Sequence, residues 1–281
     1  MRTKLRVAGA DRVRFTNGQT TNDVRKSSES ATQESCVLNA KGHLEAHLFL
    51  FSTSEAIWID ADEELRESLK ARLERYVIAD DVVVEDVTDQ FALFHVVAEK
   101  RPQISGVRFC VGSRRLAQNG WDVWGERSER ERIARALATE NEFISPERVE
   151  ILRIENGVPR WGRELTPQII PPEARLETRA IDYEKGCYIG QEVISRMKMS
   201  GQSRQRLCGV SGDEELSAGA ELRAQEKNAG KITSAAYSPR MRAHIGLAMI
   251  KRGFTEPGTQ LSAPINGRDL SVRVASLPFQ S

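Results

Sequence analysis

The chain has 281 residues, 40% of them hydrophobic and 29% charged, and its 41 basic side chains nearly balance its 40 acidic ones, for a net charge of +1. This composition is typical of a globular protein, and the length fits one large or two to three compact units. The charge balance gives no reason to expect attraction to nucleic acid or a membrane over the whole surface. No apolar run is long enough to span a bilayer, and the basic N-terminus lacks the apolar stretch of a secretory signal.

The cysteines are widely separated, without a C-x-x-C pair, and the histidines do not cluster. This pattern argues against a self-contained zinc site and against a disulfide scaffold, so we expect no metal site and a reducing, cytoplasmic location. The four cysteines are Cys36, Cys110, Cys187 and Cys208.

The first part of the chain predicts a helical turn and then a β-sheet. Amide and hydroxyl side chains surround Gly18 in residues 13–24, which favours a helical turn and loop over a strand. Residues 44–50 alternate with a period of two, and a turn at residues 40–42 joins them to the preceding segment as a hairpin. Residues 56–59 continue the sheet.

Helices and strands alternate in the next segment. Asp60 and Glu63 have the spacing of a capping box, and leucines then recur at helical intervals, as expected for an amphipathic helix packed on a sheet. Residues 82–84 and 91–97 indicate strands. A further helix is expected over residues 129–138.

Residues 101–125 combine glycines, irregular spacing and two tryptophans, Trp121 and Trp124, and predict no clear element. A tryptophan ring could stack on a flat ligand there. We favour a packing role, because large aromatic side chains usually serve burial.

Ser145 marks a clear helix start, because its hydroxyl suits an N-cap and Pro146 follows at the first helical position. Gly157 is expected to end this helix. Its predicted apolar side consists of Val149, Ile151 and Leu152.

Glu155 falls in the last turn of this helix, next to the negative end of the helix dipole, where a carboxylate is locally unfavourable. Such a conflict is expected at a functional position, or where a neighbour such as Arg153 neutralises the charge. Both interpretations are open at this point.

Residues 185–192, K-G-C-Y-I-G-Q-E, concentrate unusual residue types around one thiol. Gly190 is expected to open a helix, so Cys187 would lie just ahead of a helix N-terminus, where unpaired N–H groups and the helix dipole favour an anion. With the positive charge of Lys185, this position would lower the thiol pKa and favour the thiolate, the form that attacks electrophiles or binds metal. The alternative is a half-buried structural cysteine in a tight turn.

Beyond residue 204, short strands alternate with glycine turns, and a small antiparallel barrel is the economical way to close their edges. Asn266 with Gly267 is the strongest hairpin signal. The basic segment 202–206 lacks interleaved aromatic residues, so we interpret it as a solvated loop and not an RNA site. The expected strands cover residues 207–210, 230–237, 244–250, 261–265 and 268–274.

The motif at residues 185–192 resembles the signature of the YgfZ-type folate-binding proteins. These are relatives of the aminomethyltransferase (T-protein) of the glycine cleavage system, and they include a mitochondrial factor that helps mature iron–sulfur enzymes. The resemblance extends to the R-x-E-x-G segment at residues 153–157 and covers the whole chain. It also includes Phe15, Gly18, Gln19, Thr21, Asn22 and Asp23.

The resemblance implies an α+β, aminomethyltransferase-like fold, with two mixed α/β subdomains around a central folate channel and a small C-terminal antiparallel β-barrel. It assigns residues 1–203 to the folate-binding body and residues 204–281 to the barrel. Within the body, one subdomain combines residues 1–50 with 145–203, and residues 51–144 form the other.

The resemblance also implies a cofactor, tetrahydrofolate or a derivative. Glu155 matches the glutamate that binds the pterin ring in the aminomethyltransferases, and a carboxylate suits this role because it accepts two parallel N–H donors. Arg196 lies where the family can place a cation for the glutamate tail of folate, although a solvated helix arginine is the alternative. The other expected site residues come from the motif: Cys187 and Lys185 as the reactive residues, and Gly186, Tyr188 and Gln191 as folate contacts.

One departure from the resembled family concerns catalysis. The aminomethyltransferases carry an Asp–Asp pair after a Lys–Gly turn, and here the pair falls on Ala46 and His47. Glu45 would replace it only after a one-residue shift that turns its side chain to the other face of the strand. A general acid or base must lie within hydrogen-bond reach of its proton, which argues against ordinary glycine-cleavage activity. His47 could move a proton, but we favour an edge-strand histidine without a catalytic role.

Two functions follow from the resemblance. The first is a tetrahydrofolate-binding protein that supports assembly, repair or maintenance of iron–sulfur enzymes through Cys187, with those client enzymes or their assembly factors as partners. The alternative is a folate-dependent aminomethyltransferase or demethylase, so the sequence leaves open whether the chain is an enzyme. Neither a membrane nor nucleic acid is expected as a partner, and the oligomeric state is open.

Overall fold

The computed structural model describes residues 2–201, 203–265 and 267–280. Its internal contacts divide the chain into two compact units, and each unit combines two separate stretches of sequence. The first unit is Met1–Phe143 with Glu177–Ser195, and the second is Ile144–Leu176 with Arg196–Ser281. The expected division into a body of residues 1–203 and a barrel of residues 204–281 stays a prediction.

The first unit contains a five-stranded antiparallel sheet in the order β2-β3-β4-β1-β5. The β2–β3 hairpin confirms the period-two prediction, but both faces of β3 are buried, with His47 and Phe49 only 5% and 8% exposed. The expected edge-strand position of His47 is wrong, because β3 lies between β2 and β4. The strands are β1 (Arg2–Ala8), β2 (Gln33–Leu38), β3 (Leu44–Ser52), β4 (Ala56–Asp62) and β5 (Val83–Asp86).

The helices of this region follow the sequence signals, except at one start. The polar segment after β1 forms α1 (Arg12–Gln19) and the short η1 (Val24–Lys26), as predicted. In α2 (Arg66–Glu74), Leu69 and Leu73 are buried, as their spacing predicts. The predicted capping box is wrong, because pairing with β1 extends β4 to Asp62 and Asp60 faces Arg2 and Arg115 instead. The short η2 (Glu63–Leu65) precedes α2.

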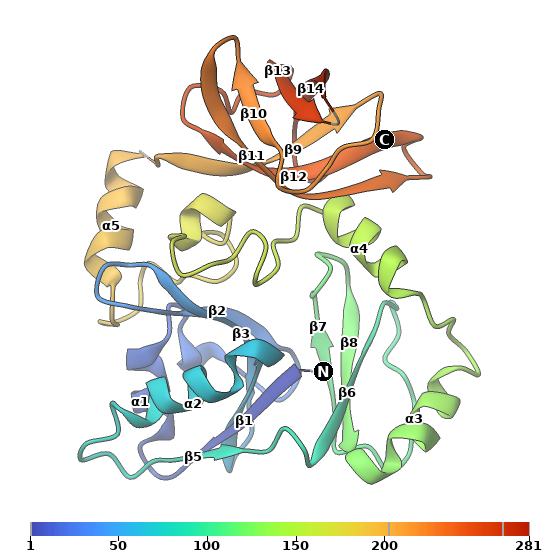
Figure 1. Ribbon diagram of the computed structural model, residues 1–281. Coiled ribbons are helices and arrows are strands. Elements are labelled where there is room, and N and C mark those ends of the chain that lie inside the picture. Colours follow the sequence, from blue (N-terminus) through green and yellow to red (C-terminus); the bar gives the residue numbers. More distant parts are fainter. Residues whose placement is uncertain (1, 202, 266, 281) are drawn as a thin grey trace. The chain divides into compact units, whose positions relative to one another are not determined.

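A second sheet of the first unit, in the order β6-β8-β7, includes the segment in which the sequence predicted no clear element. Trp124 is 1% exposed and packs in an aromatic cluster with Phe51, Trp58 and Phe91, which confirms its packing role. This cluster joins side chains of both sheets. The elements, drawn in green in Figure 1, are β6 (Phe91–Val96), β7 (Phe109–Ser113), β8 (Gly120–Glu126), η3 (Arg127–Glu129) and α3 (Arg130–Leu137).

The second unit begins with α4 (Pro146–Glu155), whose start and stop are confirmed. The hydroxyl of Ser145 accepts the Arg148 N–H at 3.3 Å, and Gly157 has a φ of +66° just past the helix end. The predicted apolar side is wrong: Val149 is 37% exposed, and Ile151 and Leu152 are only half-buried. The buried residues of α4 are Arg153, Ile154 and Glu155, two of them charged.

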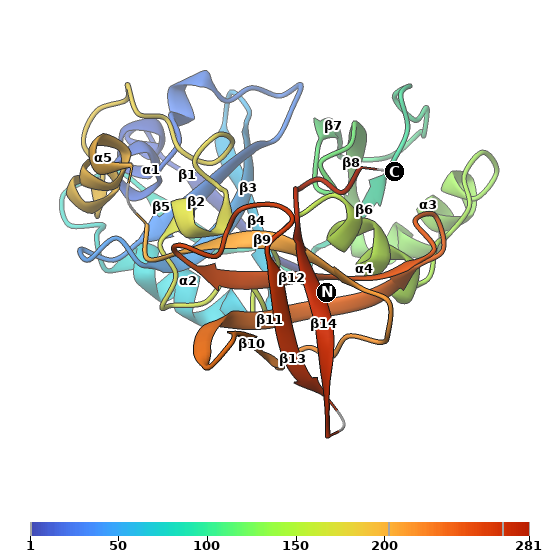
Figure 2. The same cartoon turned by 90° about the horizontal axis from the view of Figure 1, so that it is seen from above.

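The second unit also contains a closed six-stranded barrel in the order β10-β11-β12-β9-β14-β13, drawn in orange and red in Figure 1. The five predicted strands are confirmed, and β10 adds a short sixth. Figure 2 shows β13 and β14 side by side as the expected hairpin, although Asn266 lies outside the described residues. The strands are β9 (Gln205–Gly212), β10 (Glu221–Ala224), β11 (Lys227–Ser238), β12 (Ala243–Lys251), β13 (Gln260–Ile265) and β14 (Arg268–Ala275).

Two further helical segments lie between α4 and the barrel in the sequence. The short η4 (Pro171–Ala174) belongs to the second unit, and α5 (Gln191–Ser200) begins directly after Gly190, as predicted. The expected basic loop is shorter than predicted, since Gln205 and Arg206 belong to β9, and Gln202 lies outside the described residues. Across residues 2–201, 203–265 and 267–280, no helix is long and apolar enough to cross a membrane.

Candidate functional site

The loop that carries Cys187 is fastened to the first unit by Lys185. The ammonium of this 5% exposed side chain donates hydrogen bonds to the main-chain oxygens of Asn17, Thr20 and Asn22, at 2.7, 2.6 and 2.8 Å. It also lies 5.1 Å from the ring centroid of Tyr188. Burial lowers the pKa of Lys185 to about 8. Lys185 therefore anchors the motif to the end of α1.

Gly190 provides a second attachment. Its φ is +85°, and a Cβ there would lie 2.7 Å from the main-chain oxygen of Asn39 and 3.1 Å from the Cβ of Leu38. Both the backbone conformation and the close approach require glycine. A Cβ on Gly186 would meet no described atom within 4 Å. Of the two glycines that flank Cys187, Gly190 is therefore the one whose surroundings leave no room for a side chain.

Cys187 is exposed, whereas Cys36, Cys110 and Cys208 are buried. Burial raises the pKa of each of those three thiols above its ordinary value. The half-buried alternative for Cys187 is therefore wrong. The described residues contain no group of three or more His, Cys, Asp and Glu side chains that could hold a metal ion.

In the second unit, Glu155 is a buried carboxylate held by two donors. Its side chain accepts a hydrogen bond from Ser238 Oγ at 2.5 Å and one from Arg240 Nε at 3.3 Å. Arg240 is therefore the neutralising cation. The suggestion of Arg153 is wrong, because its guanidinium is bonded to Glu150 and Glu164.

The free acceptor positions of Glu155 would suit the N–H pair of a pterin. Two carboxylate oxygens offer about four lone-pair positions, of which the two bonds from Ser238 and Arg240 occupy two. Each oxygen keeps capacity for one more donor.

A buried network holds the other side of α4 against the barrel. Arg153 donates to Glu164 at 2.9 Å and to Ser234 Oγ on β11 at 2.6 Å. Glu164 in turn accepts bonds from the hydroxyls of Thr233 and Ser234. This pairing explains why α4 buries charged residues: each finds its partner in the same unit.

The remaining residues of the expected site divide between the two units. Tyr188 is 8% exposed and Gln191 is half-buried at the first position of α5, both in the first unit. Arg196 is exposed on α5 and belongs, like Glu155, to the second unit.

Sequence reasoning missed a pocket of about 420 Å³ in the first unit, and Glu34 is one of the residues that line it. Glu34 Oε2 lies 3.4 Å from His47 Nε2 and 3.0 Å from Arg179 Nε. Burial opposes ionisation, but the bond from His47 and the charge of Arg179 outweigh it, so the pKa of Glu34 is lowered. The available signal was an acidic residue in the first strand of the predicted hairpin, just before its apolar part, residues 36–38. The pocket is lined by Thr32, Gln33, Glu34, Phe49, Arg114, Ala117 and Arg179.

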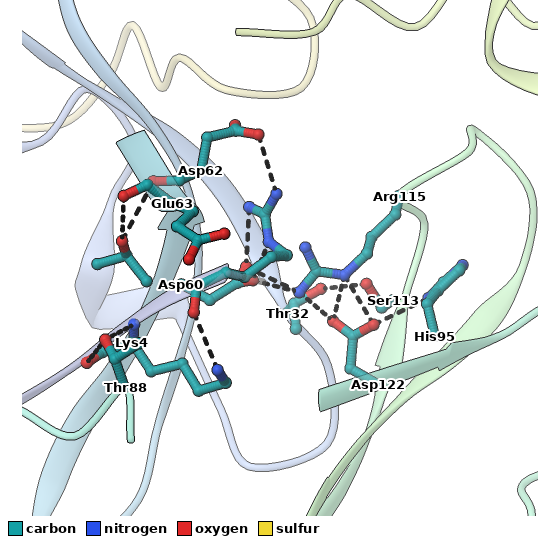
Figure 3. Close-up of polar contacts among 12 residues, drawn as sticks. Lys4, Thr32, Asp60, Asp62, Glu63, Thr88, His95, Ser113, Arg115 and Asp122 are labelled. Carbon is teal, nitrogen blue, oxygen red and sulfur yellow. Dashed lines mark hydrogen bonds and ion pairs between the residues drawn. The ribbon is translucent and has the colours of Figure 1, made fainter. Parts of the chain in front are cut away.

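The rim of this pocket is tied to a buried charge network (Figure 3). Figure 3 shows Arg115 between the carboxylates of Asp60 and Asp122, with 2.7 Å contacts to both. His95 Nδ1 lies 2.8 Å from Asp122 Oδ1 on the far side. Both carboxylate side chains are 0% exposed, and although burial opposes ionisation, the Arg115 charge holds the pKa of Asp122 well below its usual range. Arg115 also stacks 4.3 Å from the ring centroid of Phe49, a pocket wall.

Comparison with known proteins identifies the architecture. Residues 205–280 match the family model described as the glycine cleavage T-protein C-terminal barrel domain. A crystal structure of the glycine cleavage system aminomethyltransferase T from Bartonella henselae superimposes with a TM-score of 0.87 over 99% of this chain and 84% of that one, at 18% identity. The chain has the aminomethyltransferase fold. The α+β fold with a C-terminal antiparallel barrel, expected from the sequence, is thus confirmed.

Relatives in sequence carry related names. A putative chloroplastic transferase of Arabidopsis thaliana is 26% identical over 98% of this chain and 69% of its own length. An aminomethyltransferase of a Geobacillus species is 25% identical over 97% of this chain and 83% of its own length. An aminomethyltransferase of Moorella thermoacetica reaches 33% identity, but over only 46% of this chain and 36% of its own.

Proposed function

We propose that this protein is a YgfZ-type, tetrahydrofolate-binding factor that supports assembly, repair or maintenance of iron–sulfur enzymes, with Cys187 as its functional group. The observation that carries the proposal is an exposed thiol on a loop fixed by the buried Lys185 and by Gly190. A structural cysteine would not need exposure and two anchors. The proposal includes a cytoplasmic location and iron–sulfur client enzymes or assembly factors as partners.

The folate part of the proposal rests on Glu155 and on the fold. Its carboxylate is buried, and the bonds from Ser238 and Arg240 use only two of its acceptor positions, which suits the paired N–H donors of a pterin. Proteins named aminomethyltransferase, with the same fold, support a folate cofactor. We assign Glu155 to the pterin and Arg196 to the glutamate tail. Further folate contacts are assigned to Gly186, Tyr188 and Gln191.

The role of Cys187 follows from thiol chemistry. A thiolate can attack an electrophile or bind a metal, and Cys187 is the thiol that solvent and partners can reach. One cysteine cannot complete the ligand set of an iron–sulfur cluster. A cluster held through Cys187 would therefore take its other ligands from a client enzyme, an assembly factor or a small thiol.

The maintenance role is tested in a strain that lacks the gene. We expect the wild type to restore iron–sulfur enzyme activity, Cys187→Ala to fail, and the buried-thiol control Cys110→Ala to restore it. Full restoration by Cys187→Ala would remove the thiol from the proposal. Failure of the wild type would remove the maintenance role.

Folate binding is tested separately by calorimetric titration with 5-formyltetrahydrofolate. Glu155→Gln keeps the shape of the side chain and loses its charge, so we expect affinity to fall by about tenfold or more. The exposed Glu215→Gln is the matched control and should bind as the wild type does. No binding by the wild type, or equal binding by Glu155→Gln, would contradict the assignment.

A second candidate is a folate-dependent aminomethyltransferase or demethylase, favoured by the names of the relatives. The absence of the Asp–Asp pair, replaced here by Ala46 and His47, speaks against ordinary glycine-cleavage chemistry. Formation of methylenetetrahydrofolate from an aminomethyl or N-methyl donor would establish this candidate. Absence of turnover across a broad donor panel would count heavily against it.

A further inference from the structure

The pocket at Glu34 has a carboxylate oxygen available to a ligand. The Glu34 side chain is only 10% exposed, and its contacts with His47 and Arg179 both involve Oε2. No described residue donates a hydrogen bond to Oε1. An ionised oxygen that lines the pocket without a protein donor is open to a donor group on a ligand.

Two arginines bring positive charge to the same pocket. Arg179 Nε lies 3.0 Å from Glu34, but no hydrogen bond joins the Arg179 guanidinium to another described residue. The exposed side chain of Arg114 makes one long bond of 3.5 Å, to the main-chain oxygen of Ala117. Both guanidinium groups therefore have donors left for an anion.

The position of Arg114 is fixed by its neighbour. Arg115 is held between Asp60 and Asp122 (Figure 3), and the turn that contains it closes with a 2.9 Å bond from the Ala117 N–H to the Arg114 oxygen. Ala117 has a φ of +58°, a left-handed conformation that a non-glycine residue adopts at a cost. The Arg115 ion pairs thus hold a strained turn that places Arg114 at the pocket.

The lining combines these charges with an apolar wall. Phe49 is 8% exposed and forms part of the pocket surface, so the cavity offers a ring as well as an anion and two cations. A volume of about 420 Å³ is enough for a small metabolite, since ligand pockets start at about 300 Å³.

We propose that this pocket binds a small zwitterion of the amino-acid class, with its ammonium group on Glu34 Oε1, its carboxylate on Arg114 and Arg179, and its apolar part against Phe49. An ammonium ion satisfies the unpartnered carboxylate oxygen, and a carboxylate accepts the free guanidinium donors. Neither a simple amine nor a simple acid would do both. The inference goes beyond folate binding and does not depend on it, because its evidence lies in other residues.

The test is calorimetric titration of the full chain with glycine, N-methylglycine, leucine and glutamate. We expect at least one of them to bind with a Kd below about 1 mM. Its N-acetyl derivative, which lacks the ammonium, and its amide, which lacks the carboxylate, should each bind at least about tenfold more weakly. These analogues test the proposal on the wild type, independently of any variant.

Two variants then assign the two ends of the ligand. Glu34→Gln should abolish the preference over the N-acetyl derivative, and Arg114→Gln should abolish the preference over the amide. The exposed Glu215→Gln and Arg130→Gln are the matched controls and should keep both preferences. Arg114 is exposed, so its substitution leaves folding intact even if Glu34→Gln does not fold.

The outcomes separate this inference from the folate proposal. No binding by any of the four amino acids, or equal binding of the analogues, would overturn it, whatever 5-formyltetrahydrofolate does. Amino-acid binding that is unchanged or tighter in saturating 5-formyltetrahydrofolate supports a separate pocket. Loss of amino-acid binding under that condition would show that folate occupies the pocket and would also overturn the inference.

Discussion

Cys187 is exposed, whereas the other three thiols are buried, so alkylating reagents should react with Cys187 first. Under native conditions, iodoacetamide should label one site per chain, at Cys187. Cys36, Cys110 and Cys208 should react only after unfolding, because burial both blocks access and raises their pKa. Intact mass and peptide mapping measure this, with Cys187→Ala as the unlabelled control. Native labelling of a buried thiol would contradict the arrangement.

The lowered pKa of Lys185 should make the free energy of unfolding depend on pH. Its pKa is about 8 in the fold, against 10.5 for the free side chain, so between these values the unfolded chain binds more protons than the folded one. The free energy of unfolding contributed by Lys185 should therefore rise as pH increases through that window. Urea denaturation of the wild type and of Lys185→Met, from about pH 7.5 to 9.5, compares the two. If the free energy of unfolding of the wild type does not rise relative to that of Lys185→Met as pH increases, the lowered pKa of Lys185 is refuted.

The sequence located the thiol but not its anchors, and distance along the chain explains why. The three oxygens that hold Lys185 belong to residues 163 to 168 positions earlier, so no local pattern reveals them. Glu34 was missed for the same reason: its contact with Arg179 becomes visible only when the chain has folded.

Gly190 lies directly before α5, and replacing it should reduce stability more than replacing Gly186 does. In Gly190→Ala, the +85° φ and the 2.7 Å approach to the Asn39 oxygen should together cost about 1–3 kcal/mol of unfolding free energy. Gly186→Ala adds a Cβ into open space at an ordinary φ and should change stability by less than about 0.5 kcal/mol. Chemical denaturation of both variants measures the contrast. Equal losses would mean that the loop before α5 is not anchored at Gly190.

Elements with local signals were predictable, whereas their buried faces were less so. The N-cap of α4 at Ser145 and the strands of the barrel follow from neighbouring residues and turns. The buried side of α4 does not, because Arg153 and Glu155 are buried through partners on β11 and just beyond it. Hydrophobic spacing alone therefore selected the wrong face.

At the scale of the whole molecule, the composition and the resemblance were enough to predict the fold class. They did not predict which residues far apart in the sequence pair with one another. Asp60 illustrates this: its spacing to Glu63 suggested a helix cap, yet Arg2 and Arg115, 58 and 55 residues away, hold it within β4. Local patterns compete with long-range ion pairs, and a single sequence shows only the former.

Arg115 links strands of both sheets in the first unit through its ion pairs with Asp60 on β4 and Asp122 on β8. Arg115→Met would leave Asp122 buried with only His95 beside it and Asp60 with Arg2, at a cost of about 3–5 kcal/mol of unfolding free energy at pH 7. The neighbouring, exposed Arg114→Met is the control and should cost less than about 0.5 kcal/mol.

The pH dependence of this loss identifies its cause. Because Arg115 holds the pKa of Asp122 below its unfolded value, the stability it contributes is complete above that unfolded value and is lost as pH falls. The gap between the wild type and Arg115→Met should therefore narrow below about pH 4. Urea denaturation at pH 7 and pH 3 measures both gaps. A gap that is absent at pH 7 would mean that Arg115 does not join the two sheets. A gap that is equal at both pH values would mean that packing of the side chain, and not its charge, joins them.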